Sequence, residues 1–242
     1  MCLPPIWVRH LPTRPPITSE MPIGENIAKL HSALPPDVRL VAVSKFHPVE
    51  RLMEAYEAGQ RIFGENRAQE LVSKAPQMPA DVQWHFIGKL QTNKVRMIMP
   101  HVSMIQSIDS LKLLALVDKE AARIGRTVDV LLQLHVAQEE TKSGFTVDEL
   151  LEAATAGQLQ GFEHVRLRGV MGMASLTDDQ EQVRREFARI KSTFETLRSG
   201  VLAGCECFTE VSMGMSDDWP IAVDEGSTMV RVGTDIFGPR EY

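Results

Sequence analysis

The chain has 242 residues, 43% of them hydrophobic, and a formal net charge of −6. An acidic surface does not attract polyanions, which excludes nucleic acid as the main partner. No apolar run approaches the roughly 18 residues that a membrane span requires, so we expect no membrane association. The length suits a single α/β barrel, which typically takes about 250 residues.

The first twenty residues differ in composition from the rest of the chain. They contain five prolines, follow neither a helical nor a strand period, and lack the apolar core of a signal peptide. We therefore expect a flexible N-terminal extension over residues 1–20 and one domain over residues 21–242.

The cysteines are Cys2, Cys205 and Cys207. An odd number without framework spacing argues against a disulfide scaffold and indicates a reducing, cytoplasmic setting. Cys205-x-Cys207 resembles half of a zinc site, but no second half with matching spacing occurs. We therefore expect no metal.

Short apolar runs rich in Val and Ile recur along the chain. The first, RLVAVSK, is continuous rather than alternating, as expected for a strand that is covered on both faces. The predicted strands cover residues 39–45, 61–66, 84–90, 104–109, 129–136, 167–174, 208–215 and 228–238.

Helical spacing fills the stretches between these strands. Thr146 and Glu149 form the pattern of a capping box, and Asp109-Ser110 is a cap-type pair. One long charged stretch carries an apolar stripe of Val183, Phe187, Ile190, Phe194 and Leu197.

Alternating strands and helices predict an α/β fold with a parallel sheet, because parallel strands need crossover connections. Eight such units favour a single closed (β/α)8 TIM-type barrel. The rival is an open doubly wound sheet, which would be expected to carry a glycine-rich turn after its first strand. This chain has Ser44-Lys45-Phe46 there.

Lys45 ends the first predicted strand, and active sites of such barrels lie at the C-terminal ends of the strands. A lysine after an apolar strand is costly without a partner or a function. Desolvation and nearby cations make lysine amines nucleophilic in general, and an imine removes the buried charge altogether. Pairing with a carboxylate such as Glu65 explains Lys45 alone equally well.

The loops after strands seven and eight change that balance. SMGMSDDW supplies the hydroxyls of Ser212 and Ser216, with Met213 and Gly214 between them, and VRVGTDIFG supplies Gly233 and Thr234. Barrels usually hold a phosphate on these two loops, and glycines let the backbone approach its oxygens. Together with Lys45 they indicate a phosphate-bearing aldehyde. Arg231 should face a pyridine ring and keep its nitrogen unprotonated, because two adjacent cations repel each other.

Other candidates have ordinary structural explanations. His85 and His135 lie within strands, where hydrogen-bonded core histidines are common. Asp217 and Asp218 could be an acid/base pair but suit the start of a helix better. The methionines at positions 171, 173, 213 and 215 are expected to pack the barrel.

These motifs resemble the YggS-type pyridoxal phosphate homeostasis protein family, from about residue 23 to the end. The matching stretches are LVAVSK, FGENRAQE, WHFIGKLQTNK, SIDS, ETKSGF, RGVMGM, SMGMSDDW and MVRVGTDIFG. The resemblance implies a barrel similar to the N-terminal domain of alanine racemase. It also implies pyridoxal 5'-phosphate (PLP) as cofactor, held by Lys45 as a Schiff base and faced by Arg231. Phosphate contacts would come from Ser212, Gly214, Ser216, Gly233 and Thr234, with Asn66 near the ring.

Three functions follow from these residues. The first is a PLP reservoir that buffers or delivers the cofactor, with amino acids or apo-enzymes that use PLP as partners and a monomer as the expected state. The second is an amino-acid racemase or decarboxylase. A racemase needs an acid/base group on the opposite face of the ring, and the tyrosines are Tyr56, on an outer helix face, and Tyr242. The third is a Schiff-base aldolase with Glu65 or Lys89 as proton shuttle, which leaves Arg231 unexplained.

Overall fold

Eight parallel strands form a closed barrel in chain order, β1 to β8, and β1 pairs with β8 to close it. The computed structural model describes residues 13–15, 21–137 and 143–238. The strands are β1 (Arg39–Val43), β2 (Ile62–Glu65), β3 (Gln83–Phe86), β4 (Val102–Ile108), β5 (Val128–Leu134), β6 (Val165–Gly172), β7 (Glu210–Ser212) and β8 (Met229–Val232). The predicted (β/α)8 architecture is confirmed.

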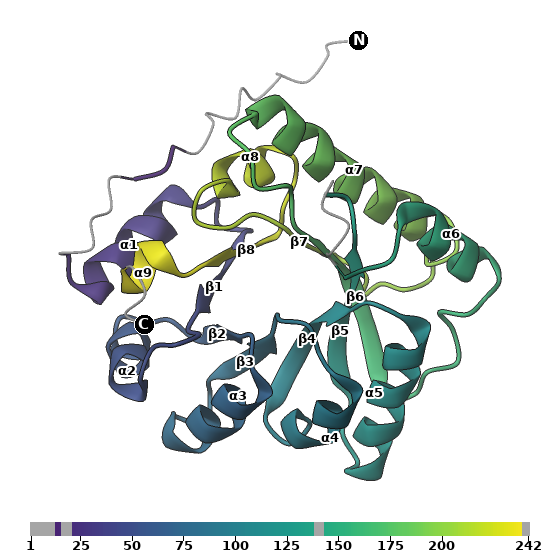
Figure 1. Ribbon diagram of the computed structural model, residues 1–242, viewed down its shortest axis with the longest axis horizontal. Coiled ribbons are helices and arrows are strands. Elements are labelled where there is room, and N and C mark those ends of the chain that lie inside the picture. The colour runs from purple at the N-terminus through teal and green to yellow at the C-terminus, as the bar shows by residue number, and fades with distance from the viewer. Residues whose placement is uncertain (1–12, 16–20, 138–142, 239–242) are drawn as a thin grey trace, which may run out of the picture.

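Helices surround the barrel, as Figure 1 shows. They are α1 (Ile23–Ala33), α2 (Val49–Glu57), α3 (Ala68–Lys74), α4 (Val95–Ile98), α5 (Leu111–Arg123), α6 (Val147–Thr155), α7 (Gln180–Ser199), α8 (Trp219–Asp224) and α9 (Thr234–Phe237). Short 3-10 helices cover Ala75–Gln77 and Thr92–Lys94. The capping box of Thr146 and Glu149 is present at the start of α6, and the whole predicted apolar stripe of α7 is buried.

The barrel has two apolar regions. The larger lies between the strands and the surrounding helices, as expected for strands covered on their outer face. The smaller fills the barrel interior and consists of Val41, Met104, Leu131, Met171 and Met229, with Ile62 packed against them. Buried polar side chains adjoin this cluster: Gln106 Nε2 lies 3.0 Å from Met229 Sδ, and Gln106 also contacts Ser212.

Several predicted strands extend too far at their C-terminal ends. The third was predicted to reach residue 90 and ends at Phe86. A Cβ on Gly88 would lie 2.4 Å from the carbonyl oxygen of Asn66, so the chain passes there against the backbone that follows β2. The eighth was predicted to reach residue 238 and ends at Val232, before α9. At these positions the apolar sequence continues, but the chain has left the sheet to form the mouth of the barrel.

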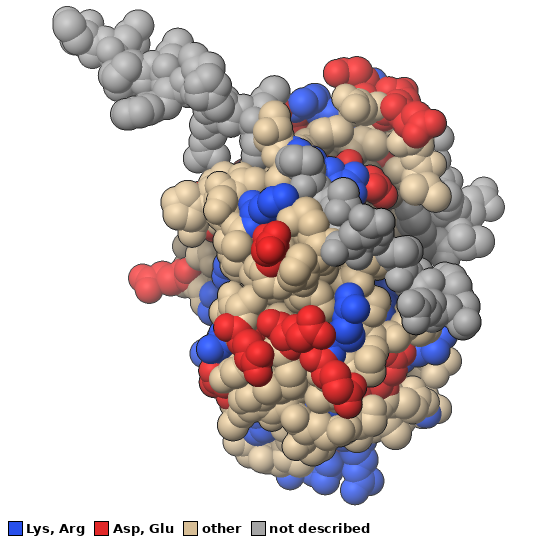
Figure 2. All heavy atoms as spheres, turned by 90° about the vertical axis from the view of Figure 1, so that its left-hand side faces the viewer, with Lys and Arg blue, Asp and Glu red and all other residues tan. Residues whose placement is uncertain are grey.

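The outer surface carries charges of both signs. Figure 2 shows the face over α1, α2 and α9, where acidic and basic side chains are interspersed. Within the described part of the chain, no helix combines the length and apolar character that a membrane crossing requires. In the same residues, no group of three or more His, Cys, Asp or Glu side chains gathers as metal ligands would.

Candidate functional site

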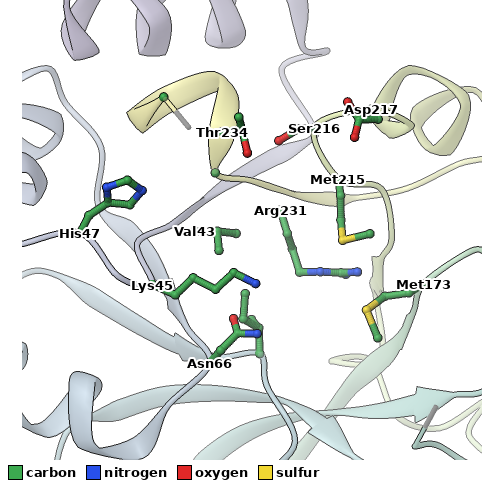
Figure 3. A pocket seen from close by; sticks show the side chains of 13 residues that line it. Val43, Lys45, His47, Asn66, Met173, Met215, Ser216, Asp217, Arg231 and Thr234 are labelled. Atoms are coloured by element: carbon green, nitrogen blue, oxygen red, sulfur yellow. The ribbon is translucent and has the colours of Figure 1, made fainter. Parts of the chain in front are cut away.

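A pocket of about 280 Å³ opens at the C-terminal ends of the strands, where barrels carry their sites. This is close to the lower end of the range for small-molecule sites, about 300–1,000 Å³. Its lining comprises Val43, Lys45, His47, Asn66, Ile87, Met173, Met215, Ser216, Asp217, Arg231, Gly233, Thr234 and Gly238. In Figure 3, Lys45 and Arg231 extend into the pocket from different sides, and Ser216 and Thr234 lie together at one end of it.

Lys45 lies two residues beyond β1 and is half-buried. The next residue, Phe46, has a φ of 68°, a left-handed conformation that is uncommon for a residue other than glycine. Its N–H donates to Glu70 Oε2 at 2.8 Å, and the guanidinium of Arg67 stacks 4.5 Å from its ring centre. These contacts hold the turn that directs Lys45 into the pocket.

Glu65, the alternative partner for Lys45, is held by other groups. Its Oε1 accepts hydrogen bonds from Ser44 Oγ at 2.7 Å and from Lys74 Nζ at 2.8 Å. Lys74 also contacts Glu70, the residue that supports Phe46. Burial raises the pKa of Glu65, and the ammonium of Lys74 opposes that rise. The carboxylate and Lys74 therefore form a buried ion pair beneath the turn.

Arg231 is the buried cation of the pocket wall, with 4% of its surface exposed. Its Nη1 donates to the carbonyl oxygen of Ser212 at 2.8 Å and to Ser212 Oγ at 2.7 Å, and its Nη2 donates to the carbonyl oxygen of Gly172 at 2.9 Å. Burial lowers its pKa to about 10, against the attraction of Asp218. Arg231 is therefore still a cation at neutral pH.

One end of the pocket carries hydroxyl groups on two loops (Figure 3). Ser216 follows β7 and Thr234 follows β8, and both line the pocket. A Cβ on Gly233 would lie 3.2 Å from the carbonyl oxygen of Val43, so the end of β8 lies against the end of β1. The two loops are also joined by Arg14, which donates to Asp235 at 2.5 Å and to Asp217 at 3.2 Å.

The structure does not bring every predicted phosphate contact to the pocket wall. Met213 packs in the outer apolar core and Gly214 is buried under α8. Ser212 is fully buried in the barrel interior, where its hydroxyl donates to Gln106 Oε1 at 2.7 Å. Side chains alternate along a strand, and in β7 Ser212 faces inward below the mouth. Of the two serines, Ser216 is the one that lines the pocket.

Asn66 supplies an unsatisfied group. Its Oδ1 is buried and has no hydrogen-bond partner in the described residues, although the side chain lines the pocket. A buried acceptor without a donor is costly, so a ligand with an O–H or N–H group would stabilise it. A lysine amine, a guanidinium, two hydroxyls and this amide oxygen together fit a phosphorylated aromatic aldehyde.

The remaining candidates separate into core and pocket. His85 is buried, and its Nδ1 lies 2.9 Å from Gln106 Nε2. Asp218 precedes α8 and accepts the N–H of Met215, and Asp217 lies on the pocket rim. Of the four methionines, Met171 packs the barrel as expected, whereas Met173 and Met215 line the pocket.

Gln106 had no sequence signal beyond its place in a predicted strand. The first three residues of the ETKSGF stretch, Tyr242 and most of residues 1–20 lie outside the described residues.

Comparison with known proteins identifies the family. The profile described as "Alanine racemase, N-terminal domain" matches residues 22–241. A pyridoxal phosphate homeostasis protein of Pasteurella multocida is 40% identical over 208 residues, which cover 85% of this chain and 88% of the relative. The chain belongs to the pyridoxal phosphate homeostasis protein family. The resemblance predicted from the sequence motifs is thereby confirmed.

Solved structures agree with this family and fold. The structure of PipY from Synechococcus elongatus was determined with PLP bound, and PipY is 40% identical to this chain. The two structures superpose with a TM-score of 0.81, and the match covers 89% of this chain and 100% of PipY. An alanine racemase of Clostridium difficile is 15% identical, with a TM-score of 0.73 over 91% of this chain and 57% of the racemase. The second likeness concerns the barrel fold alone.

Proposed function

We propose that this protein binds PLP in the pocket at the mouth of the barrel, and that it buffers or delivers the cofactor in the cytoplasm. The observation that carries the proposal is the placement of Lys45 and Arg231 in one pocket with the hydroxyls of Ser216 and Thr234. The family name and the PLP-bound structure of PipY support it.

Each group in the pocket has a role toward the cofactor. Lys45 Nζ would attack the aldehyde carbon to form a C=N bond, and the aldehyde oxygen would leave as water. Ser216, Thr234 and the backbone at Gly233 would hold the phosphate, and Asn66 would accept a hydrogen bond from the ring substituent. Arg231 would donate to the ring nitrogen and keep it unprotonated. When bound, PLP supplies an electrophilic carbon and an electron-withdrawing ring.

A carrier suits this pocket better than a racemase. A racemase must exchange protons on both faces of the ring, and the described pocket lining includes Lys45 but no tyrosine. Tyr56 lies on α2 and its hydroxyl donates to Asp81 at 2.7 Å, outside the pocket. The aldolase hypothesis is weakened as well, because Glu65 is paired with Lys74 and Lys89 lines a neighbouring hollow instead.

The first experiment identifies the lysine that reacts. Protein incubated with PLP should gain visible absorbance, and borohydride reduction followed by peptide mapping should place the added mass on Lys45. Lys45→Ala should remain colourless. Lys89→Ala, a lysine at the same end of the barrel but outside the pocket, should behave as the wild type. A wild-type protein that takes up no PLP would contradict the proposed function.

The second experiment separates a carrier from an enzyme. PLP-loaded protein is mixed with single enantiomers of amino acids, and both the spectrum and the enantiomer ratio are followed. A carrier gives a stoichiometric spectral change without turnover. Sustained racemisation or decarboxylation would contradict the carrier function while leaving PLP binding intact.

A further inference from the structure

A chain of buried hydrogen bonds crosses the barrel interior beneath the pocket, from β8 to β3. Arg231 Nη1 donates to Ser212 Oγ at 2.7 Å, and Ser212 Oγ lies 2.7 Å from Gln106 Oε1. Gln106 Nε2 then lies 2.9 Å from His85 Nδ1. All four side chains are buried, with 0–4% of their surface exposed. We call Ser212, Gln106 and His85 the relay.

The chemistry of the four groups fixes the direction of every bond. A guanidinium has no acceptor, so Ser212 Oγ accepts from Arg231 and gives its single proton to Gln106 Oε1. The amide nitrogen of Gln106 therefore faces His85 and donates to Nδ1, which leaves the imidazole proton on Nε2. Burial lowers the pKa of His85 to about 3, so the ring is neutral as this arrangement requires.

The relay restricts how Arg231 can present itself to the pocket. Ser212 takes both N–H groups of Nη1, and the carbonyl oxygen of Gly172 takes one of Nη2. Three of the five N–H groups are thus committed to the barrel. The guanidinium cannot rotate without breaking bonds to buried partners, whose loss is costly. The N–H groups that remain, on Nε and Nη2, keep a fixed direction.

We propose that Ser212, Gln106 and His85 are positioning residues that hold the Arg231 guanidinium in place for the nitrogen of a bound pyridine ring. This inference rests on the proposed function, because it names residues that serve the same site without touching the ligand. A guanidinium that is held still keeps the ring nitrogen as an acceptor. A guanidinium that can turn away lets a solvent proton compete for that nitrogen.

The first test needs no PLP. Nitrogen-15 NMR of the ligand-free protein should show His85 with its proton on Nε2 at neutral pH. Gln106→Glu places an acceptor opposite His85 and should move that proton to Nδ1, while still accepting from Ser212. A wild-type His85 with its proton on Nδ1 would overturn the relay, whatever the protein binds.

The second test uses PLP. Ser212→Ala and Gln106→Met should each weaken PLP binding about tenfold, which corresponds to one lost buried interaction of about 1.4 kcal/mol. They should also raise the pH at which the spectrum of bound PLP shows protonation of the ring nitrogen. The matched control is Ser227→Ala, a buried serine that donates to Met213 O at 2.8 Å and lies outside the pocket lining. It should change stability but leave the spectrum and its pH profile as in the wild type.

The outcomes distinguish the positioning role of the relay from PLP binding itself. Equal spectral pH profiles in Ser212→Ala, Gln106→Met and wild type would overturn the positioning role even if PLP binds normally. If Ser212→Ala does not fold, Gln106→Met and Gln106→Glu still decide the question. A wild-type protein that takes up no PLP contradicts the proposed function instead, and the NMR measurement still decides the geometry of the relay.

Discussion

At the scale of single residues, the sequence indicates several side chains of the site but not the contacts that orient them. Lys45 was predicted from its place at the end of an apolar strand, but the left-handed turn at Phe46 that aims it was not. That turn needs Glu70 and Arg67, both more than twenty residues further along the chain. Ser212 was read as a phosphate contact because it precedes a glycine loop. In the structure its hydroxyl faces the barrel interior, because side chains alternate along a strand, and it accepts a hydrogen bond from Arg231.

His85 gives a pH-dependence that can be measured on unfolding. Its pKa is about 3 in the folded protein and about 6.5 when unfolded, because the fold desolvates the ring. Below about pH 6.5 the unfolded state binds a proton that the folded state does not, so stability falls as the pH drops toward 3. The contribution is at most about 1.4 kcal/mol per pH unit.

We expect His85→Gln to lose this contribution. The new side chain can still offer an oxygen to Gln106, so the relay keeps its last acceptor. Urea unfolding of both proteins at several values between pH 4 and pH 7 measures the difference. The variant should be less sensitive to acid than the wild type, and identical slopes would show that His85 is not desolvated in the folded protein.

At the scale of elements, the strands were predicted well and their ends were not. All eight predicted strands occur. Their continuous Val and Ile runs are typical of parallel strands that are covered on both faces, which is why the sequence identified them. At the mouth of the barrel, loops and short helices such as α9 are as apolar as the strands. The spacing of apolar residues therefore does not show where a strand ends there. The helix α1 was not predicted at all, whereas α6 carried a capping box that was recognised and is present.

The loop between β7 and α8 is set by close contact at Gly214. This residue has a φ of 95°, and a Cβ there would lie 2.6 Å from Ala222 Cβ and 2.9 Å from Trp219 Cα. Gly214→Ala should therefore push α8 from the barrel and move Ser216. We expect a loss of about 1–3 kcal/mol in the free energy of unfolding and weaker PLP binding. In Gly204→Ala the new Cβ meets nothing within 4 Å, so this control should retain both properties.

At the scale of the whole molecule, the barrel is closed and its pocket lies at one open end. The sequence predicted this architecture because eight units in one chain leave few alternatives, and family resemblance agreed with it. Closure places loops from both ends of the chain beside each other: β1 pairs with β8, and Arg14 contacts Asp235 in α9. A ligand that contacts several of these loops should therefore stabilise the barrel as a unit.

Binding should be visible as global stabilisation. PLP at one hundred times its dissociation constant should raise the free energy of unfolding by about 2.7 kcal/mol. The same concentration should stabilise Lys45→Ala much less. Thermal unfolding measures the stability of each sample. Sedimentation velocity on the same samples tests the expectation that the protein is a monomer. Equal stabilisation of the two proteins would place the bound PLP elsewhere than at Lys45.

The relay also constrains how this protein can change over evolutionary time. The donors and acceptors of the relay are matched to one another. Removing the hydroxyl at position 212 leaves the Gln106 oxygen without that donor, and replacing Gln106 leaves Ser212 and His85 mismatched. Positions 85, 106 and 212 should therefore covary across the family, although they belong to three different strands. Family members that differ at only one of these three positions should be rare. In such members we expect the residue equivalent to Arg231 to have changed as well.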